Sequence, residues 1–513
     1  MNIRPSSASW LYRRRRLAVL CAPLGLMIAP AFGQEQTVRM TSSVRVSEMI
    51  TDNARLESSG SAKSDAITQI SPSVRFDARG TRLSGSLGLN LNSTFYASDS
   101  SSQSNYLTLS GTGKAILLEN RSDVDLLASV SRQSAYSFSP QAADQVTGTG
   151  NQTQVRMFSI SPNLRERFGG TGSLDLRYSF MQLDSDSTAM NRSESQTLSF
   201  TATDPYALGL LGWSVNLRDS RNDNQSYRAQ EQFTSRFTGF AQVDPQLTLR
   251  LIGGYESNNF AASASRNATV YGVGADWLPT SRSRFSATVE KRFFGTGYSF
   301  TGQHRAGNFA FTGSYSRDVS SSSQTLLGAV TLYDLLMLQY ANTYPNINER
   351  SVFVRRLIDT NAQGMSGLIV GAQSVLANGY FLDRRFQGGL TIIGVRNSIA
   401  FIAFQSQRET FADRTFALTG STSTTQAVTT SGASISANHN LSAETSANLS
   451  LTSTRSSTAD SSIASTRSRI ISAGLSSRLS RRTTGSLTVR NNHGSGSSGY
   501  TENAVIGVVN FQF

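Results

Sequence analysis

Arginine is the residue type in this chain with the most evident capacity for chemistry. Of the 47 basic residues only Lys63, Lys114 and Lys291 are lysines, which leaves 44 arginines. A guanidinium group can donate two parallel hydrogen bonds to one carboxylate or phosphate, so an arginine-rich surface favours anionic partners.

The sequence contains few residue patterns that could support catalysis or metal binding. His304, His439 and His493 lie far apart, and the single cysteine is Cys21, so no zinc-ligand spacing is present. Gly113-Lys114 lacks the first glycine and the following Ser or Thr of a phosphate-binding loop, and no G-x-S-x-G elbow occurs. We predict no enzyme, no metal and no cofactor. The alternative is a catalytic site that forms only in the folded protein, where neighbouring strands bring a serine or a pair of acids beside a base.

The N-terminus has the pattern of a secretory signal peptide. Arg13 to Arg16 precede the apolar stretch 17–32, which indicates cleavage between Gly33 and Gln34. A retained membrane anchor is the alternative, which Pro23 and Pro30 disfavour. We therefore expect residues 1–33 to be removed and residues 34–513 to form the mature protein.

The mature chain has to be stabilised without disulfides. Removing residues 1–33 removes the cysteine and five arginines, which lowers the formal net charge from +13 to +8. A secreted protein without disulfides needs a large core or a closed sheet. Export also argues against a nucleic-acid partner, and anionic glycans or lipopolysaccharide fit the positive charge better.

Hydrophobicity in the mature chain alternates with a period of two, as in β-strands. In 173–180, for example, Leu174, Leu176, Tyr178 and Phe180 alternate with polar residues. Runs of about ten residues match tilted transmembrane strands. A mean hydropathy of -0.25 and the absence of a long apolar run beyond the N-terminus exclude a helical membrane protein.

The connections between these runs alternate in length. Short turns occur at 79–80, 119–120, 168–170, 204–205, 244–245, 279–280, 306–307 and 395–396, and longer polar segments at 51–65, 97–105, 135–151, 184–194, 408–426 and 455–466. Short turns on one rim and long loops on the other are typical of outer-membrane barrels. The sequence therefore predicts an all-β, up-and-down antiparallel transmembrane β-barrel of the bacterial outer membrane, with roughly 22 strands (16 to 24) and both termini periplasmic.

The last predicted strand ends in an aromatic residue. Val509, Phe511 and Phe513 share one parity, and Phe513 is the final residue. This pattern resembles the assembly signal of outer-membrane proteins, so we expect recognition by the barrel assembly machinery. An ordinary strand ending in phenylalanine by chance is the alternative.

Residues opposite in parity to the apolar face should line the lumen. This rule gives eight basic and five acidic candidates: Arg75, Arg177, Arg218, Arg250, Arg284, Arg292, Arg385, Arg490, Asp77, Asp125, Asp175, Glu290 and Asp383. Pairs such as Asp175 with Arg177 would neutralise each other across strands. The wall is then either an anion-binding surface or a salt-bridged wall without a ligand.

Residues 326–376 break the strand pattern, and from Thr331 to Asn361 the apolar residues have helical spacing. Phe353 with Leu357, and Val354 with Ile358, lie four residues apart. We expect a short helical insert that is either a rim loop or a plug. The plug is considered because barrels of about 22 strands are plugged. In the second case Arg350, Arg355 and Arg356 would form a positively charged gate.

Several short motifs resemble a family of PEP-CTERM system-associated outer-membrane proteins. They are 292–298 (RFFGTGY), His304-Arg305, 314–318 (SYSRD), 51–53 (TDN), 70–72 (ISP), Arg384-Arg385 and 394–397 (GVRN), spread over most of the mature chain. The resemblance implies an outer-membrane barrel found alongside exosortase sorting and exopolysaccharide production, with no established enzymatic activity.

Two functions of different classes follow. The first is a channel for an anionic or neutral polymer such as exopolysaccharide, with the insert as gate. The second is a non-conducting structural or docking barrel whose long loops bind surface polymer or exported proteins. Outer-membrane lipid and lipopolysaccharide are expected partners of both, and nucleic acid of neither. A soluble secreted β-solenoid is disfavoured because no fixed repeat period is present.

Overall fold

The structure is a computed structural model. It describes residues 37–98, 103–144, 146–187, 192–224, 227–260, 266–321, 337, 350, 354, 379–411, 416–417, 424–460, 463–496 and 499–513. Within these ranges, no helix has both the length and the apolar character needed to cross a membrane.

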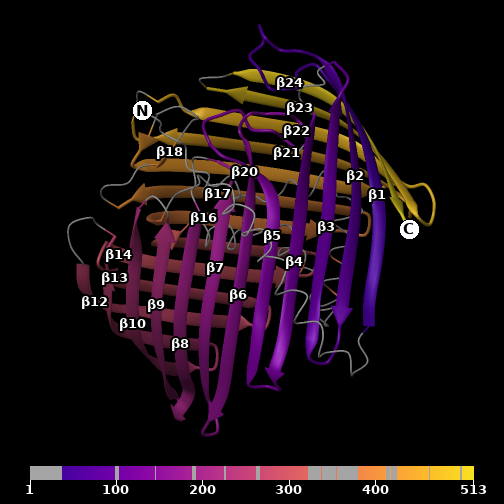
Figure 1. Ribbon diagram of the computed structural model, residues 1–513. Coiled ribbons are helices and arrows are strands. Elements are labelled where there is room, and N and C mark those ends of the chain that lie inside the picture. Colours follow the sequence, from indigo (N-terminus) through magenta and orange to yellow (C-terminus); the bar gives the residue numbers. More distant parts are fainter. Residues whose placement is uncertain are drawn as a thin grey trace, which may run out of the picture.

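The chain forms a closed antiparallel barrel of 22 strands (Figure 1). Each barrel strand pairs with the next one in the chain, β17 pairs with β20, and β1 pairs with β24 to close the sheet. The predicted fold class and the prediction of roughly 22 strands are confirmed. The strands are β1 (Thr37–Thr51), β2 (Asp65–Arg79), β3 (Leu83–Tyr96), β4 (Ser104–Leu118), β5 (Ser122–Ser134), β6 (Gln152–Phe168), β7 (Gly172–Ser185), β8 (Ser193–Leu208), β9 (Leu211–Asn224), β10 (Tyr227–Asp244), β11 (Leu247–Asn258), β12 (Arg266–Thr280), β13 (Ser283–Arg292), β14 (Gly295–Ala306), β15 (Phe309–Ser321), β16 (Tyr380–Ile393), β17 (Asn397–Thr410), β20 (Ala427–Asn440), β21 (Thr445–Thr458), β22 (Thr466–Arg478), β23 (Thr483–Ser495) and β24 (Tyr500–Gln512).

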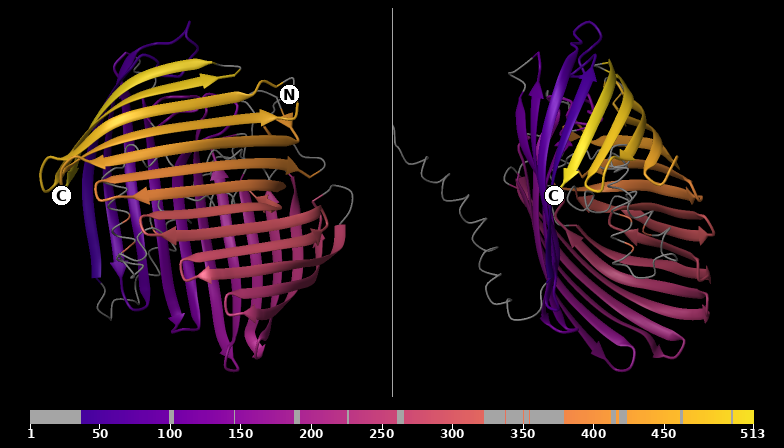
Figure 2. Two further views of the ribbon diagram at one scale, coloured as in Figure 1. Left: turned by 180° about the vertical axis from the view of Figure 1, so that it is seen from behind. Right: turned by 90° about the vertical axis from the view of Figure 1, so that its right-hand side faces the viewer.

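Two very short strands, β18 (Phe416–Ala417) and β19 (Thr424–Thr425), pair with each other outside the barrel sheet. The barrel strands are tilted, so those of opposite walls cross when viewed through the barrel. Figure 2 shows this for the indigo and magenta strands β1–β9 against the orange and yellow strands β16–β24. Tilt of this kind is required to close a sheet into a barrel.

Side-chain parity separates an apolar outer face from a polar inner face. On β21, Leu449 and Leu451 point outward with 53% and 38% of their surface exposed, while Ser450 between them bonds Ser472 of β22 on the inner face. In a bilayer the exposed side chains of the outer face would contact lipid. The barrel thus has the surface of a transmembrane barrel.

Both described ends of the chain lie at the rim with short turns. Thr37 pairs with Arg79 beside the β2–β3 turn, and the Phe513 N–H bonds the Ser42 carbonyl. Tight turns at this rim place Asn120 and Gly209 at φ values of 59° and 74°, which asparagine and glycine tolerate.

The predicted turn at Asp204-Pro205 is wrong. Strand β8 continues to Leu208, and the chain turns at Gly209-Leu210. Pro205 is accommodated in an irregular register between Asp204 and Leu208, because a bulge does not need the N–H that proline lacks. The rule of loop lengths also has two exceptions at the long-loop rim, since only residues 225–226 connect β9 and β10 and only Phe293 and Phe294 connect β13 and β14.

Aromatic side chains mark the outer face near the short-turn rim. Phe168 stacks on Trp213 with ring centroids 6.1 Å apart, and Trp277 lies 5.5 Å from Phe285. Trp277 is 49% exposed on the outer face. Aromatic rings at this level are typical of the membrane–water interface.

The outward parity predicts losses of stability of very different size for arginine substitutions at two adjacent positions. Leu449→Arg should destabilise the folded barrel by about 2–4 kcal/mol because it places a charge in the middle of the apolar band. Ser450→Arg, which points into the lumen, is the matched control and should cost much less. Urea unfolding in lipid vesicles measures both, and equal losses would contradict the assigned parity.

Candidate functional site

The structure places all thirteen predicted lumen residues on the inner parity of their strands. Register carries this parity from strand to strand, as in the row Arg177, Ser199, Arg218 across β7, β8 and β9. Six of the eight arginines and all five acids take part in ion pairs: Arg75 with Asp77, Arg177 with Asp125, Asp175 with Arg165, Arg250 with Asp276, Glu290 with Arg236 and Arg292, Asp383 with Arg385, and Arg490 with Glu502.

The pairing partners on the wall β4–β7 differ from the prediction. Asp175 bonds Arg165 at 3.2 Å and Arg177 bonds Asp125 at 2.9 Å, so these two neighbours do not neutralise each other. The reason is geometric, since Asp175 and Arg177 lie on one strand and each faces a different position on its neighbouring strands. The result is a ladder in which Lys114 also approaches Asp125, at 3.8 Å.

A second ion-pair cluster spans β11, β13 and β15. Arg292 is only 4% exposed and bonds the fully buried Glu256 at 2.8 Å and Asp318 at 3.0 Å. Glu256 also accepts a hydrogen bond from the Phe293 N–H, at 2.6 Å. Because every charge here has a partner, this cluster braces the wall and leaves little capacity for a ligand.

Two predicted lumen arginines have no ion pair within the described residues. Arg218 and Arg284 lie on the inner parity of β9 and β13, where Arg284 pairs in register with Gln303. Of the predicted gate, Arg355 and Arg356 lie outside the described residues, as does almost all of the insert 326–376, and Arg350 is described without its sequence neighbours. The insert and its gate stay predictions.

The β5–β6 connection, residues 135–151, crosses the lumen. Phe138 is buried in one cluster with Phe381 of β16 and Val428 of β20, and β16 is halfway round the 22-stranded sheet from β5. Tyr500 of β24 donates a hydrogen bond of 3.0 Å to the Gln141 carbonyl. We call residues 135–151 the crossing loop.

One buried arginine pins the crossing loop to the wall. Arg490 of β23 is 5% exposed, bonds Asp144 of the loop, and bonds the fully buried Glu502 of β24 at 2.8 Å. Its Nη2 also donates to the Thr147 hydroxyl at 3.3 Å. A guanidinium shared between a loop acid and a wall acid couples the loop position to the barrel interior.

Asp144 is charged at neutral pH. Desolvation raises the pKa of this carboxyl, but the charge and hydrogen bond of Arg490 outweigh it, and the Thr147 N–H adds a bond of 2.7 Å. The net effect holds the pKa of Asp144 below its usual value of 3.8. The loop therefore keeps its ionic attachment at neutral pH.

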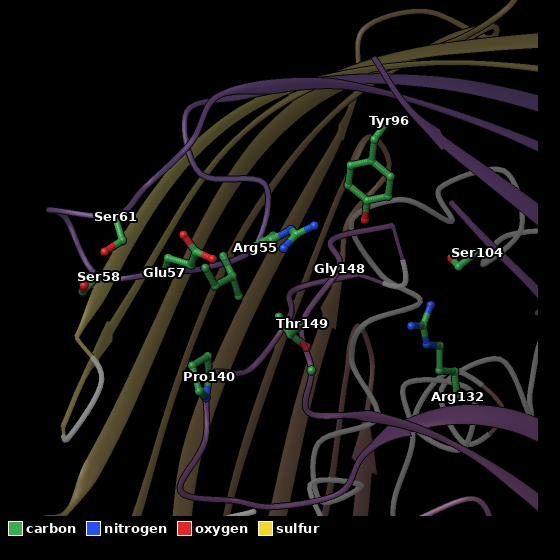
Figure 3. Close-up of a pocket in the computed structure, with 12 residues that line it drawn as sticks. Arg55, Glu57, Ser58, Ser61, Tyr96, Ser104, Arg132, Pro140, Gly148 and Thr149 are labelled. Atoms are coloured by element: carbon green, nitrogen blue, oxygen red, sulfur yellow. The ribbon is translucent and has the colours of Figure 1, made fainter. Parts of the chain in front are cut away.

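A cavity of about 840 Å³ lies between the crossing loop and the β1–β2 loop (Figure 3). Arg55 and Glu57 line it from the β1–β2 loop, Arg132 from β5, and Thr149 from the crossing loop. Its hydroxyl and guanidinium donors suit a polar or anionic ligand such as a sugar acid. The cavity lies at the long-loop rim.

The crossing loop fits closely against Tyr96 on the cavity wall. The Tyr96 hydroxyl donates to the Val146 carbonyl at 3.1 Å, and a Cβ added at Gly148 would lie 2.4 Å from that hydroxyl oxygen. Only glycine avoids this clash. Asn151 closes the base of the loop by accepting from the Tyr136 N–H at 2.8 Å.

Aromatic packing joins other strand ends across the same rim. Phe260 stacks against Tyr380 and Phe411 with ring centroids 4.9 and 5.0 Å apart. The Tyr380 hydroxyl donates to Ser220 of β9 at 3.1 Å, and its backbone N–H donates to Gln230 of β10. Segments from β16 and β17 thus contact β9–β11 on the inner side of the barrel.

Sequence reasoning missed several of these residues. Glu256 and Glu502 have the inner parity, so the alternation rule could have identified them. Asp144, Arg55 and Glu57 lie in segments interpreted as external loops, and nothing in their local pattern signals that these segments fold inward. For catalysis and metal binding, the prediction is that the chain has no catalytic residues and no metal site. Within the described ranges, no group of three potential metal ligands is present.

The terminal predictions are placed as follows. Val509, Phe511 and Phe513 share the outward parity, with Phe511 43% and Phe513 70% exposed. Gly33 and Gln34, the predicted cleavage site, lie outside the described residues.

No protein-family model and no curated protein matches the sequence. Among solved structures, the chain is similar to the siderophore receptor PirA from Pseudomonas aeruginosa, with 12% identity over 94% of this chain and 81% of that chain and a TM-score of 0.42. It is also similar to the ferric-catecholate import receptor Fiu from E. coli K12, with 10% identity, 92% and 81% coverage and a TM-score of 0.45. Values this low assign no ligand or partner to the chain.

Substitution of Arg490 is expected to lower the stability of the folded barrel by a large amount. Arg490→Gln should destabilise the barrel by about 3–5 kcal/mol because Glu502 is left buried without a cation. Hydrogen exchange of residues 135–151 should rise at the same time, since Asp144 loses its attachment. Arg177→Gln, which breaks a half-exposed pair, is the control and should cost less than about 1 kcal/mol. Unchanged loop exchange in Arg490→Gln would contradict the pinning role.

Proposed function

We propose that this protein is an integral outer-membrane barrel that acts as a gated channel for an anionic or neutral polymer, with the crossing loop as gate. The observation that carries the proposal is the crossing loop itself, which spans the lumen and is attached ionically through one arginine, Arg490. Hydrogen bonds from Tyr96 and Tyr500 and the packing of Phe138 also hold the loop. None of these contacts belongs to the backbone ladder of the sheet, so the loop can be released without unfolding the barrel.

The membrane assignment rests on the closed sheet and its apolar outer face. A closed barrel leaves no unpaired strand edge in lipid, as a membrane requires. The predicted signal peptide supports export. Because both described termini lie at the short-turn rim, we infer that this rim is periplasmic and that the long loops are extracellular. The outward-facing Val509, Phe511 and Phe513 would then present the assembly signal to the barrel assembly machinery.

The substrate class follows from the charges at the long-loop rim. The cavity presents Arg55 and Arg132 together with hydroxyl groups, and carboxylated sugars can accept bidentate hydrogen bonds from guanidinium groups. The lumen wall below is polar and largely ion-paired, which suits passage of a hydrated chain without tight binding. No step of this proposal requires catalysis or a cofactor.

The assignment to exopolysaccharide production and PEP-CTERM protein sorting rests on the sequence motifs alone. In one of these motifs, the segment 292–298, Arg292 and Phe293 both bond Glu256. This motif therefore has a structural role in bracing the wall. The association with exosortase sorting is retained as a proposal.

A non-conducting docking barrel is the second candidate. It is favoured by the burial of Phe138, which is 3% exposed in its cluster with Phe381 and Val428. A loop anchored by apolar packing as well as by charge could fill the lumen permanently. In that case the cavity between the β1–β2 loop and the crossing loop would bind surface polymer at the rim.

Planar-bilayer recordings separate the two candidates. We expect low conductance from the mature protein, higher conductance from a variant with residues 138–149 replaced by a short glycine linker, and block of that variant by an acidic oligosaccharide. Arg490→Gln should show intermediate, fluctuating conductance because the loop loses its ionic attachment.

Arg156→Gln is the matched control, since this arginine pairs with Asp186 on the outer face, and it should behave like the unsubstituted protein. Heat-modifiable migration in gels verifies that each variant has folded. Silence from the folded loop-replacement variant would overturn the channel and leave the docking barrel.

A further inference from the structure

Three arginines form an exposed group on the outer face at the long-loop ends of β21 and β22. Arg455 continues the outward parity of Leu449 and Leu451, and Arg467 and Arg469 continue that of Ile471. All three arginines are exposed. We call them the outer arginine group.

The register brings like charges together in this group. Arg455 of β21 lies directly opposite Arg467 of β22, and Arg469 lies between Ser453 and His493 of the flanking strands. Like charges directly opposite each other destabilise a strand pair unless something compensates them.

No acid in the same two rows of the outer face provides that compensation. The outward positions in register with the group are Gln405, Ser431 and Ser495 in one row, and Ala403, Ala433, Ser453, His493 and Thr501 in the other. Within the described residues, none of the three arginines forms an ion pair. The group is therefore a local excess of positive charge.

Several outward arginines elsewhere along the same rim are compensated. Arg156 of β6 lies 2.7 Å from Asp186, Arg221 of β9 lies 3.2 Å from Glu231, and Arg192 lies 2.6 Å from Glu194. Arg317 of β15 and Arg384 of β16 also lie opposite each other on the outer face without an ion pair in the described residues, but Arg317 donates to the Thr296 carbonyl at 2.6 Å and lies over the Phe294 ring. The β21–β22 part of the outer face differs from this pair because it carries three arginines that have no ion pair in the described part of the chain.

The position of the group relative to the apolar band indicates the kind of ligand. Arg469 is two residues from Ile471, the outermost exposed apolar residue of β22, and Arg467 is two residues further. At about 3.4 Å per residue, the guanidinium groups lie at head-group level beside the lipid tails. Phosphate is the head-group anion that arginine binds bidentately.

We propose that the outer arginine group binds the phosphates of lipid A, the bisphosphorylated glycolipid of the outer leaflet. The assignment to the outer leaflet rests on the orientation proposed above, with the long loops outside the cell. Two phosphates on one rigid disaccharide match a positive group that spans two strands, and the acyl chains would lie along Leu451 and Ile471.

Native mass spectrometry of the detergent-solubilised mature protein tests this site. We expect bisphosphorylated lipid A to bind at least about tenfold more tightly than the dephosphorylated lipid with the same acyl chains. The triple variant R455S/R467S/R469S should lose this preference, and the matched double variant R156S/R221S should keep it.

Equal binding of the two lipids by the unsubstituted protein would overturn the proposal, and that measurement does not depend on any variant folding. A preference that persists in the triple variant would overturn it as well. Binding of phosphatidylglycerol or of inorganic phosphate as tightly as lipid A would overturn the choice of ligand. This assay measures lipid binding in detergent and does not measure conductance. Failure of the channel proposal in bilayer recordings would therefore not decide the lipid A proposal.

Discussion

A strand in lipid has no water to satisfy its backbone, and this constraint explains most of the structure. Every N–H and C=O within the bilayer must be paired inside the protein, so the sheet has to close through β1 and β24. Closure fixes the register of each pair, and the register fixes which side chains face lipid. The outward apolar band and the inward ion pairs are two consequences of the same pairing.

The polar lumen is formed by the side chains that alternate with the lipid-facing ones along each strand. Charges inside the barrel have to find partners, and most of them do so across strands, as Arg177 does with Asp125. Arg490 differs because one of its two acids, Asp144, belongs to a loop. The wall thereby attaches a segment that is not part of the sheet, and this ion pair, together with the hydrogen bond from Tyr96 to Val146, links the barrel to the cavity at its rim.

The sequence was sufficient for everything that depends on parity. Alternation along 173–180 and the contrast of short and long connections predicted the barrel, its strand number and the inward positions of Asp175 and Glu290. Partners were harder to predict, because Asp175 pairs with Arg165 through the register of β6 and β7, which no local pattern contains. The turn after β8 was misplaced because proline usually ends a strand, whereas Pro205 lies in a bulge.

The crossing loop could not be predicted at all. Its residues 135–151 have the polar composition of an external loop, and their inward path depends on Phe138 and Asp144 meeting side chains from β16, β20 and β23. Such contacts arise only when the barrel closes and brings opposite walls within reach. The outer arginine group was equally invisible, since the opposition of Arg455 and Arg467 depends on register.

Disulfide trapping tests the central claim, that residues 135–151 cross the lumen. The predicted mature chain has no cysteine, so F138C/V428C would introduce the only pair, while S434C/T452C on neighbouring strands, whose hydroxyls lie 3.2 Å apart, is the positive control. We expect both pairs to cross-link on mild oxidation, and Arg490→Gln to reduce cross-linking of the first pair only. Efficient cross-linking of the control with none between residues 138 and 428 would contradict the account.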